Sequence, residues 1–169
     1  MIAENLIHDY QMKWMRIQKV MQEKGADGCL LSNGINLFYT TGHMYNGYFY
    51  LPAEGKPYFF IKRPNGIEGE HVIYLRKPEQ LPDLFRENNL LMPEKLLLEA
   101  DELSYSDYIR LQNIFQPKEC MNATAILRQI RRVKTPWEIE QTRLCARRHE
   151  AAWKADNRGS AVSTSSSGR

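Results

Sequence analysis

The sequence has few cysteines and histidines, and it lacks the short motifs of several common catalytic sites. Its cysteines, Cys29, Cys120 and Cys145, are odd in number and lack metal-ligand spacing, so we expect reduced thiols and a cytoplasmic protein. The serine-nucleophile pattern G-x-S-x-G, the zinc pattern H-E-x-x-H and the phosphate-binding pattern G-x-G-x-x-G are all absent. The sequence therefore gives no sign of these three chemistries.

Long apolar runs are also missing. None approaches the ~20 residues that a membrane-spanning helix needs, and the first residues lack the basic start and apolar stretch of a signal peptide. We therefore expect no membrane partner. The 169 residues, 43% hydrophobic and 25% charged, suit one globular domain of ordinary size.

The excess of positive charge is small. The net charge is +3, and much of the excess lies between residues 128 and 148, at Arg128, Arg131, Arg132, Lys134, Arg143, Arg147 and Arg148. A basic helix can bind phosphate backbones. A solvated face, or a surface that docks an acidic neighbour, is the favoured interpretation, and we do not expect a nucleic-acid partner.

The clearest local signal is a helix start near the end of the sequence. Thr135 can cap the first turn, Glu138 can reach back to the Thr135 N–H as in a capping box, and Pro136 stands at the first helical position. These signals predict a helix from Thr135 to the mid-150s. The Gly/Ser-rich residues 156–169 have little apolar area to bury, so a flexible tail is expected there.

Helical and extended patterns alternate through the rest of the chain. Apolar periodicity predicts helices over residues 5–24, 81–88, 104–115 and 123–132, and apolar runs predict strands over 26–32, 72–75 and 95–99. Residues 47–51 and 57–61 flank a short Gly-containing turn, which predicts a hairpin. Residues 35–39 form a further short apolar element. A hairpin within an alternating pattern favours an α/β fold with a mixed sheet.

Four stretches, taken in order, resemble the N-terminal domain of the creatinase, prolidase and aminopeptidase P family. They are residues 16–31, with a helix followed by Gly25-Ala26-Asp27; residues 35–42, with Asn36, Tyr39 and Gly42; Leu97-Leu98-Glu99; and residues 127–139, with Arg131, Lys134, Glu138 and Ile139. Thr40 departs from the pattern, because the family usually has leucine there. The resemblance covers roughly residues 7 to 153 and ends at Ala155.

The resemblance implies a three-layer, ribonuclease H-like domain with a mixed sheet over residues 1–134, then a connector helix over 135–155 and the tail over 156–169. Arg131, Lys134, Thr135 and Glu138 would form the structural connector. In the family, a catalytic pita-bread domain follows, which binds two divalent metals (Mn, Co or Zn) and cleaves the bond before proline or, in one branch, hydrolyses creatine. Its ligands would lie beyond residue 169, so we expect no catalytic residue, metal ligand or cofactor in this chain.

The segment from His43 to Tyr48 is the strongest candidate for a functional loop. The family resemblance implies that such a loop can narrow the entrance of a partner subunit's active site, which would give His43, Tyr45 and Tyr48 a substrate-gating role. The alternative, an ordinary surface loop with aromatic packing, stays open. His71, near Glu68 and Glu70, is interpreted as part of a solvated loop, and Cys29 as a packing residue in a buried strand.

Two functions follow from the resemblance. In the first, the chain is the non-catalytic domain of a proline-specific metallopeptidase, contacts its own catalytic domain, forms a homodimer and meets the peptide substrate indirectly. In the second, it is an autonomous metal-free module that binds peptides or proteins. Under either interpretation this chain alone is not an enzyme. The substrate, the oligomeric state and the origin of the tail are left open.

Overall fold

The computed structural model describes the backbone of residues 2–162 and the side chains of residues 5–155. Two compact units are present, Ile7–Val133 and a second unit that combines the first residues with the segment from Lys134 onward. Among the described residues, none of the helices has the length and hydropathy that a membrane span requires.

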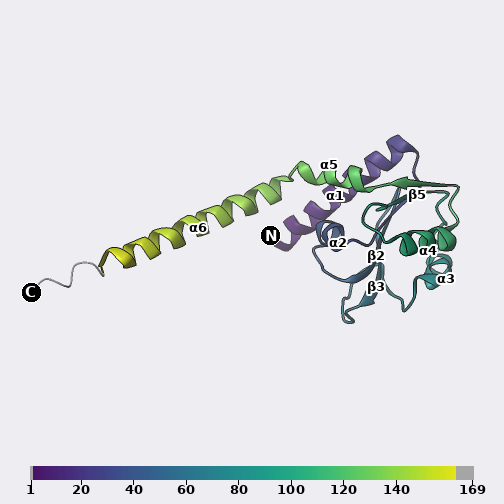
Figure 1. Ribbon diagram of the computed structural model, residues 1–169, viewed down its shortest axis with the longest axis horizontal. Helices are drawn as coiled ribbons and strands as arrows, with labels where there is room; N and C mark the ends of the chain where they lie inside the picture. The colour runs from purple at the N-terminus through teal and green to yellow at the C-terminus, as the bar shows by residue number, and fades with distance from the viewer. Residues whose placement is uncertain (1, 163–169) are drawn as a thin grey trace, which may run out of the picture. The chain divides into compact units, whose positions relative to one another are not determined.

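Helices and strands alternate along the chain (Figure 1). The helices are α1 (Ile2–Lys24), α2 (Gly34–Thr41), α3 (Leu81–Glu87), α4 (Tyr105–Phe115), α5 (Thr124–Arg132) and α6 (Pro136–Val162), with a short 3-10 helix η1 (Pro78–Gln80) before α3. The strands are β1 (Gly28–Leu31), β2 (Asn46–Pro52), β3 (Tyr58–Arg63), β4 (Val72–Tyr74), β5 (Lys95–Leu98) and β6 (Glu119–Asn122).

The six strands of the described part of the chain join one mixed sheet in the order β4-β3-β2-β1-β5-β6. Strand β1 runs parallel to β5, and β5 runs parallel to β6. Strand β2 runs antiparallel to β3, as the predicted hairpin requires, and also antiparallel to β1, whereas β4 runs parallel to β3. The predicted α/β fold with a mixed sheet is therefore confirmed.

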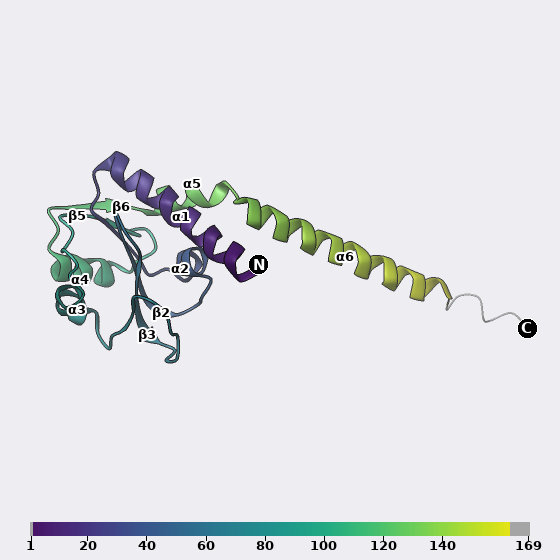
Figure 2. The ribbon, with the colours of Figure 1, turned by 180° about the vertical axis from the view of Figure 1, so that it is seen from behind.

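Side-chain alternation along the strands separates two hydrophobic cores. Cys29 and Leu31 of β1 pack on one face of the sheet, with residues of α1, α2 and α5, whereas Leu30 packs on the other face with residues of α3 and α4. The two ribbon views show these helices on opposite sides of the sheet (Figures 1 and 2). Because helices cover both faces of the sheet, the central strands are apolar at consecutive positions. The fold therefore has three layers.

Helix α1 is anchored to α2 by polar groups on its buried side. The Trp14 indole N–H donates to the carbonyl oxygen of Thr40 at 2.8 Å. Beside it, Lys13 pairs with Asp9 at 2.6 Å, and the Lys13 ammonium lies 4.6 Å from the centre of the Tyr39 ring. The buried charges of α1 are thus compensated within the helix and by an aromatic face.

The structure defines one element that the sequence left untyped and differs from the prediction at two others. Residues 35–39 belong to helix α2, which Asn33 caps by accepting the Ile35 N–H at 2.9 Å. Strand β6 was not predicted, because a four-residue edge strand with Glu119 and Asn122 at its ends has no extended apolar pattern. Helix α6 continues to Val162, past the predicted end at residue 155, and the rest of the predicted tail, 163–169, lies outside the described residues.

Candidate functional site

A buried polar cluster joins three of the family-like motifs at the carboxyl ends of β1 and β5. Glu99 follows β5 and is 1% exposed; its carboxylate accepts the backbone N–H groups of Ser32 at 2.6 Å and of Asn33 at 2.9 Å. The Asn36 amide donates to the other Glu99 oxygen, and the Asn36 side-chain oxygen accepts a hydrogen bond from the Arg131 guanidinium at 2.6 Å. Asn36, Glu99 and Arg131, far apart in sequence, therefore form one connected network.

The predicted gating loop, His43 to Tyr48, is only partly a loop, because it runs from the end of α2 into β2 and Tyr48 is a strand residue. Gly42 before it and Gly47 within it leave no room for a Cβ. At Gly42 (φ 73°) a Cβ would lie 2.0 Å from the Tyr10 hydroxyl, and at Gly47 (φ 157°) a Cβ would lie 2.1 Å from the Phe60 carbonyl oxygen. Both φ values lie in the region that favours glycine. Gly47 sits at an irregularity in the pairing of β2 with β3, which turns the chain at the start of β2.

The His43 imidazole binds the turn after α2 and does not line the pocket that Tyr45 and Tyr48 line. Its side chain is exposed, and its Nδ1 donates to the Thr41 carbonyl oxygen at 2.9 Å, since a carbonyl can only accept. The Thr41 hydroxyl oxygen in turn accepts the His43 backbone N–H at 3.1 Å. The histidine therefore closes the turn after α2.

The side chains of Tyr45 and Tyr48 are more buried than that of His43. Tyr45 is 9% exposed, and its hydroxyl has no hydrogen-bond partner among the described residues. Burial raises the pKa of Tyr45 above its usual value. Burial, followed by the negative charge of Asp107, raises the pKa of Tyr48, whereas Arg110 opposes the shift. Both phenols are therefore neutral donors at physiological pH.

Both tyrosines line a pocket of about 360 Å³ at the carboxyl end of β1, which we name the strand-end pocket. It is lined by Ser32, Tyr45, Asn46, Gly47, Tyr48, Lys62, Pro78, Leu103, Asp107 and Arg110. Arg110 is committed to a two-point ion pair with Glu79, at 2.6 and 2.8 Å, and Asp107 accepts the Ser104 hydroxyl at 2.6 Å. Lys62 is an exposed cation of this pocket and forms no ion pair with the described residues. The structure thus brings Tyr45 and Tyr48 together and leaves His43 outside.

Several residues of the strand-end pocket could not be predicted from the sequence, because the sheet topology alone brings them together. Strand β1 leads to α2 on one face of the sheet, and the adjacent parallel strand β5 leads to α4 on the other face. Open α/β sheets form ligand crevices where neighbouring connections diverge in this way. Ser32, Lys62 and Arg110 meet only through that topology, and no local sequence motif marks them.

The predicted capping box at the start of α6 is confirmed. The Thr135 backbone N–H donates to the Glu138 carboxylate at 2.9 Å, and the Glu138 N–H donates to the Thr135 hydroxyl oxygen at 3.2 Å. Lys134 directly precedes this box, and Arg131 belongs to the buried cluster of the first unit. The interdomain role of these four residues remains a prediction.

His71 and Cys29, the other residues considered in the sequence, lie in packed surroundings. His71 stacks on Tyr58 with ring centres 4.3 Å apart, and its neighbour Glu70 pairs with Lys56 at 2.8 Å. Cys29 is buried in β1, and burial raises the pKa of its thiol. No group of three His, Cys, Asp or Glu side chains within the described part of the chain could hold a metal ion.

Comparisons with known proteins agree with this fold. A family model described as the creatinase/prolidase N-terminal domain matches residues 13–133. No protein with a curated description matches the sequence.

Solved structures of dipeptidases share the fold. The Xaa-Pro dipeptidase from Bacillus anthracis has a TM-score of 0.61 and 20% identity over 78% of this chain and 38% of that chain. The prolidase from Pyrococcus horikoshii has a TM-score of 0.60 and 19% identity over 76% of this chain and 37% of that chain. A Creatine_N superfamily domain of a dipeptidase from Streptococcus thermophilus has a TM-score of 0.59 and 17% identity over 70% of this chain and 97% of that chain.

This chain therefore spans less than two-fifths of the two longer peptidase chains and nearly all of the Streptococcus domain. Because the family match covers most of the sequence, the protein belongs to the creatinase/prolidase N-terminal domain family.

Proposed function

We propose that this chain serves as the non-catalytic N-terminal domain of a proline-specific metallopeptidase, where it contributes oligomer contacts and substrate gating. The observation that carries the proposal is the strand-end pocket, in which Tyr45 from the loop after α2 and Tyr48 from β2 lie with Lys62. The half-buried Tyr48 can donate a hydrogen bond to a peptide carbonyl group, and Lys62 can attract a peptide carboxylate, whereas the buried Tyr45 ring shapes the pocket wall. A peptide at this position would meet polar groups without a group that cleaves it.

The chemistry of cleavage would belong to another domain. The described residues do not fit the family's two-metal site, which needs several carboxylates and a histidine close together. We therefore derive no catalytic step from this chain. A partner catalytic domain would supply the divalent metals and the activated water, and this domain would limit which peptides approach.

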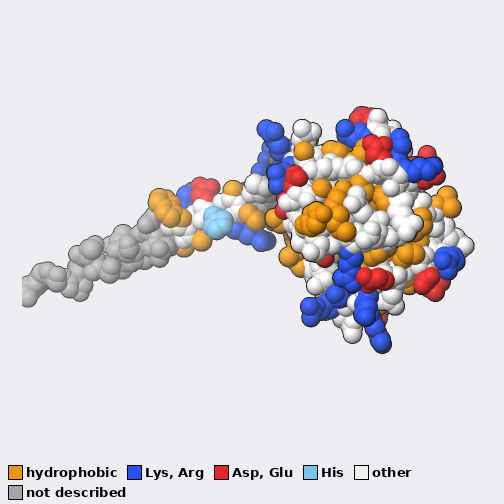
Figure 3. Space-filling model, turned by 45° about the vertical axis from the view of Figure 1, so that its right-hand side comes forward, with side chains coloured by type: hydrophobic (Ala, Val, Ile, Leu, Met, Phe, Trp, Pro, Cys, Tyr) orange, Lys and Arg blue, Asp and Glu red, His pale blue; other side chains and the backbone are white. Residues whose placement is uncertain are grey.

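Exposed apolar side chains support the oligomer contacts. Ile7 and Met15 of α1, Ile35 and Phe38 of α2, and Met44 of the loop are all more than half exposed. Figure 3 shows apolar side chains gathered on the visible face of the unit Ile7–Val133, with charged side chains around them. Exposed apolar surface of this kind is typical of association sites. We propose a homodimer, which light scattering at tens of micromolar would show as a mass near twice 19.8 kDa.

The function proposal is tested with purified chain, Mn²⁺ or Co²⁺ and an Xaa-Pro dipeptide. The expected result is no turnover and no stoichiometric metal after desalting, with a known prolidase as positive control. Turnover that survives repurification and scales with the concentration of this chain would contradict the proposal.

A second candidate is an autonomous peptide- or protein-binding module. The observation that favours it is the Streptococcus domain, 97% of which this chain covers, because a solved chain of that extent carries the fold without a second domain. A module should hold peptides with micromolar affinity by itself, whereas a gate needs only a weak, millimolar contact. The affinity measured for the isolated chain therefore separates the two.

A further inference from the structure

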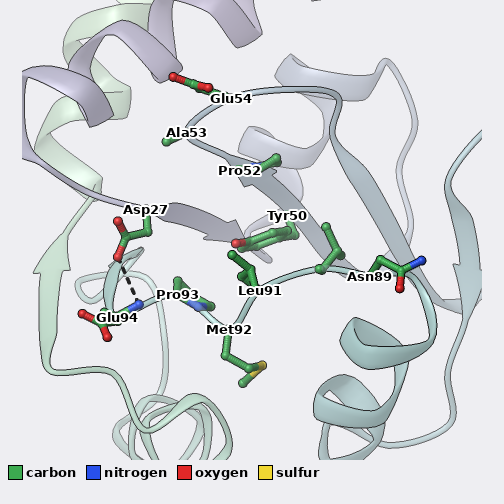
Figure 4. Close-up of a pocket in the computed structure, with 11 residues that line it drawn as sticks. Asp27, Tyr50, Pro52, Ala53, Glu54, Asn89, Leu91, Met92, Pro93 and Glu94 are labelled. Carbon is green, nitrogen blue, oxygen red and sulfur yellow. Dashed lines mark hydrogen bonds between the residues drawn. The ribbon is translucent and has the colours of Figure 1, made fainter.

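A second pocket lies at the opposite end of β1 from the strand-end pocket. It has a volume of about 630 Å³ and is walled by the β2–β3 turn on one side and by the α3–β5 loop on the other (Figure 4). Its lining residues are Asp27, Tyr50, Pro52, Ala53, Glu54, Asn89, Leu90, Leu91, Met92, Pro93 and Glu94. We name it the acidic pocket, since it has three carboxylates and no basic lining residue.

Tyr50 forms the floor of the acidic pocket and offers an unused polar group. The residue is 2% exposed, and its hydroxyl makes no hydrogen bond within the described part of the chain. Figure 4 shows this hydroxyl pointing toward the side of the pocket where Asp27 lies. The hydroxyl oxygen keeps solvent access at the pocket wall, so a bound cation that donates a hydrogen bond to it would replace water there.

The carboxylates of the acidic pocket can still accept hydrogen bonds from a ligand. One oxygen of Asp27 accepts the backbone N–H groups of Glu94 at 3.1 Å and Lys95 at 2.8 Å, so the other oxygen stays available to a ligand. Glu54 is exposed on the turn and forms no ion pair within the described part of the chain, whereas Glu94 pairs with Lys118 at 2.8 Å. The pocket therefore keeps a net negative charge that suits a cation.

Apolar side chains line the path between the rim and the floor. Met92, Leu90 and Pro52 are half-buried walls, and Leu91 at the rim is 89% exposed. An aliphatic stem would pack on the walls while its cationic head reached Asp27 and Tyr50. A small free cation would leave Leu91 exposed to water. If the basic side chain belongs to a polypeptide, the residues that flank it in that polypeptide would cover Leu91.

We propose that the acidic pocket binds a basic side chain, arginine or lysine, presented by a polypeptide with apolar neighbouring residues. This inference goes beyond the gating role, because it uses a different pocket at the other end of the central strand.

The test is an NMR titration of the ¹⁵N-labelled chain with the peptide acetyl-Leu-Arg-Leu-amide. Saturable shifts are expected at residues 27, 50–54 and 89–94. Tyr50→Phe should weaken binding about tenfold, because it removes a hydrogen bond to a charged group, and Glu54→Gln should weaken it about threefold. Tyr58→Phe and Glu87→Gln, which change a tyrosine and an exposed glutamate outside the pocket, should bind like the parent.

Several results would overturn the proposal. They are an absence of saturable shifts at these residues, equal binding of acetyl-Leu-Glu-Leu-amide, or unchanged affinity in both pocket variants. Equal affinity for agmatine would identify a small organic cation as the ligand and would also refute a polypeptide. If Tyr50→Phe does not fold, Glu54→Gln decides the matter, because its side chain lies on an exposed turn.

Discussion

The Arg131 guanidinium lies 2.6 Å from the side-chain oxygen of Asn36, although 95 positions separate the two residues in the sequence. Through Asn36 the contact reaches Glu99, which also holds the turn after β1. Helix α5, the turn after β1 and the end of β5 are therefore fixed by one polar network.

Glu99→Gln should destabilise the domain by about 2 kcal/mol, because a glutamine can keep the backbone N–H groups of Ser32 and Asn33 only by turning its own amide group toward that of Asn36. Urea unfolding would measure the loss. Glu87→Gln, at an exposed helix position, is the matched control and should change the free energy of unfolding by less than about 0.5 kcal/mol. Equal stability of the two variants would mean that the network does not stabilise the fold.

The ion pair between Glu79 and Arg110 predicts a pH dependence. The hydrogen bonds from Arg110 lower the pKa of Glu79 from 4.5 to about 2. A lowered pKa in the folded state means that the contribution to stability is present above pH 4.5 and is lost as the pH falls toward 2. The difference in unfolding midpoint between the parent and Glu79→Gln should shrink across this range. A difference that stays constant from pH 6 to pH 2 would contradict the assignment.

Thr135→Ala should cost about 1 kcal/mol, because it removes the hydroxyl that accepts the Glu138 N–H. Pro136→Ala should cost much less, since the proline at the first helical position satisfies no donor. Denaturant melts followed by circular dichroism would compare both with the parent. The same midpoint for the parent and Thr135→Ala would show that the cap does not stabilise α6.

Gly47→Ala should destabilise the domain by about 3 kcal/mol, because the new Cβ would meet the Phe60 carbonyl oxygen as well as an unfavourable φ. Gly55→Ala is a suitable comparison. Gly55 also has a positive φ of 97°, but its Cβ would meet nothing within 4 Å, so only about 1 kcal/mol should be lost. Thermal unfolding of both variants would separate crowding from strain, and equal losses would rule out the crowding at Gly47.

Local patterns in the sequence predict most of the fold. The hairpin, the helix of residues 104–115 and the capping box at Thr135 each depend on neighbouring residues, and all three are present. Strand β6 escaped prediction because its pairing with β5, a parallel neighbour distant in sequence, stabilises a short segment with polar ends.

The candidate site was predictable only in part. The aromatic loop pointed to Tyr45 and Tyr48, but Ser32, Lys62 and Arg110 come from other elements and meet them only after the sheet forms. Tyr50 looked like an ordinary strand residue, because a sequence cannot show that its hydroxyl would face a pocket without a partner.

The most direct test of the gating proposal is an NMR titration of the chain with an Ala-Pro dipeptide. The account predicts saturable shifts at residues 45–48 and 62 with a dissociation constant on the order of millimolar. Lys62→Met should weaken the contact several-fold, because it removes the exposed cation, whereas Lys24→Met at the end of α1 should have no effect. Shifts that are absent at these residues, or that are the same in the parent and Lys62→Met, would contradict the claim that the strand-end pocket meets the substrate.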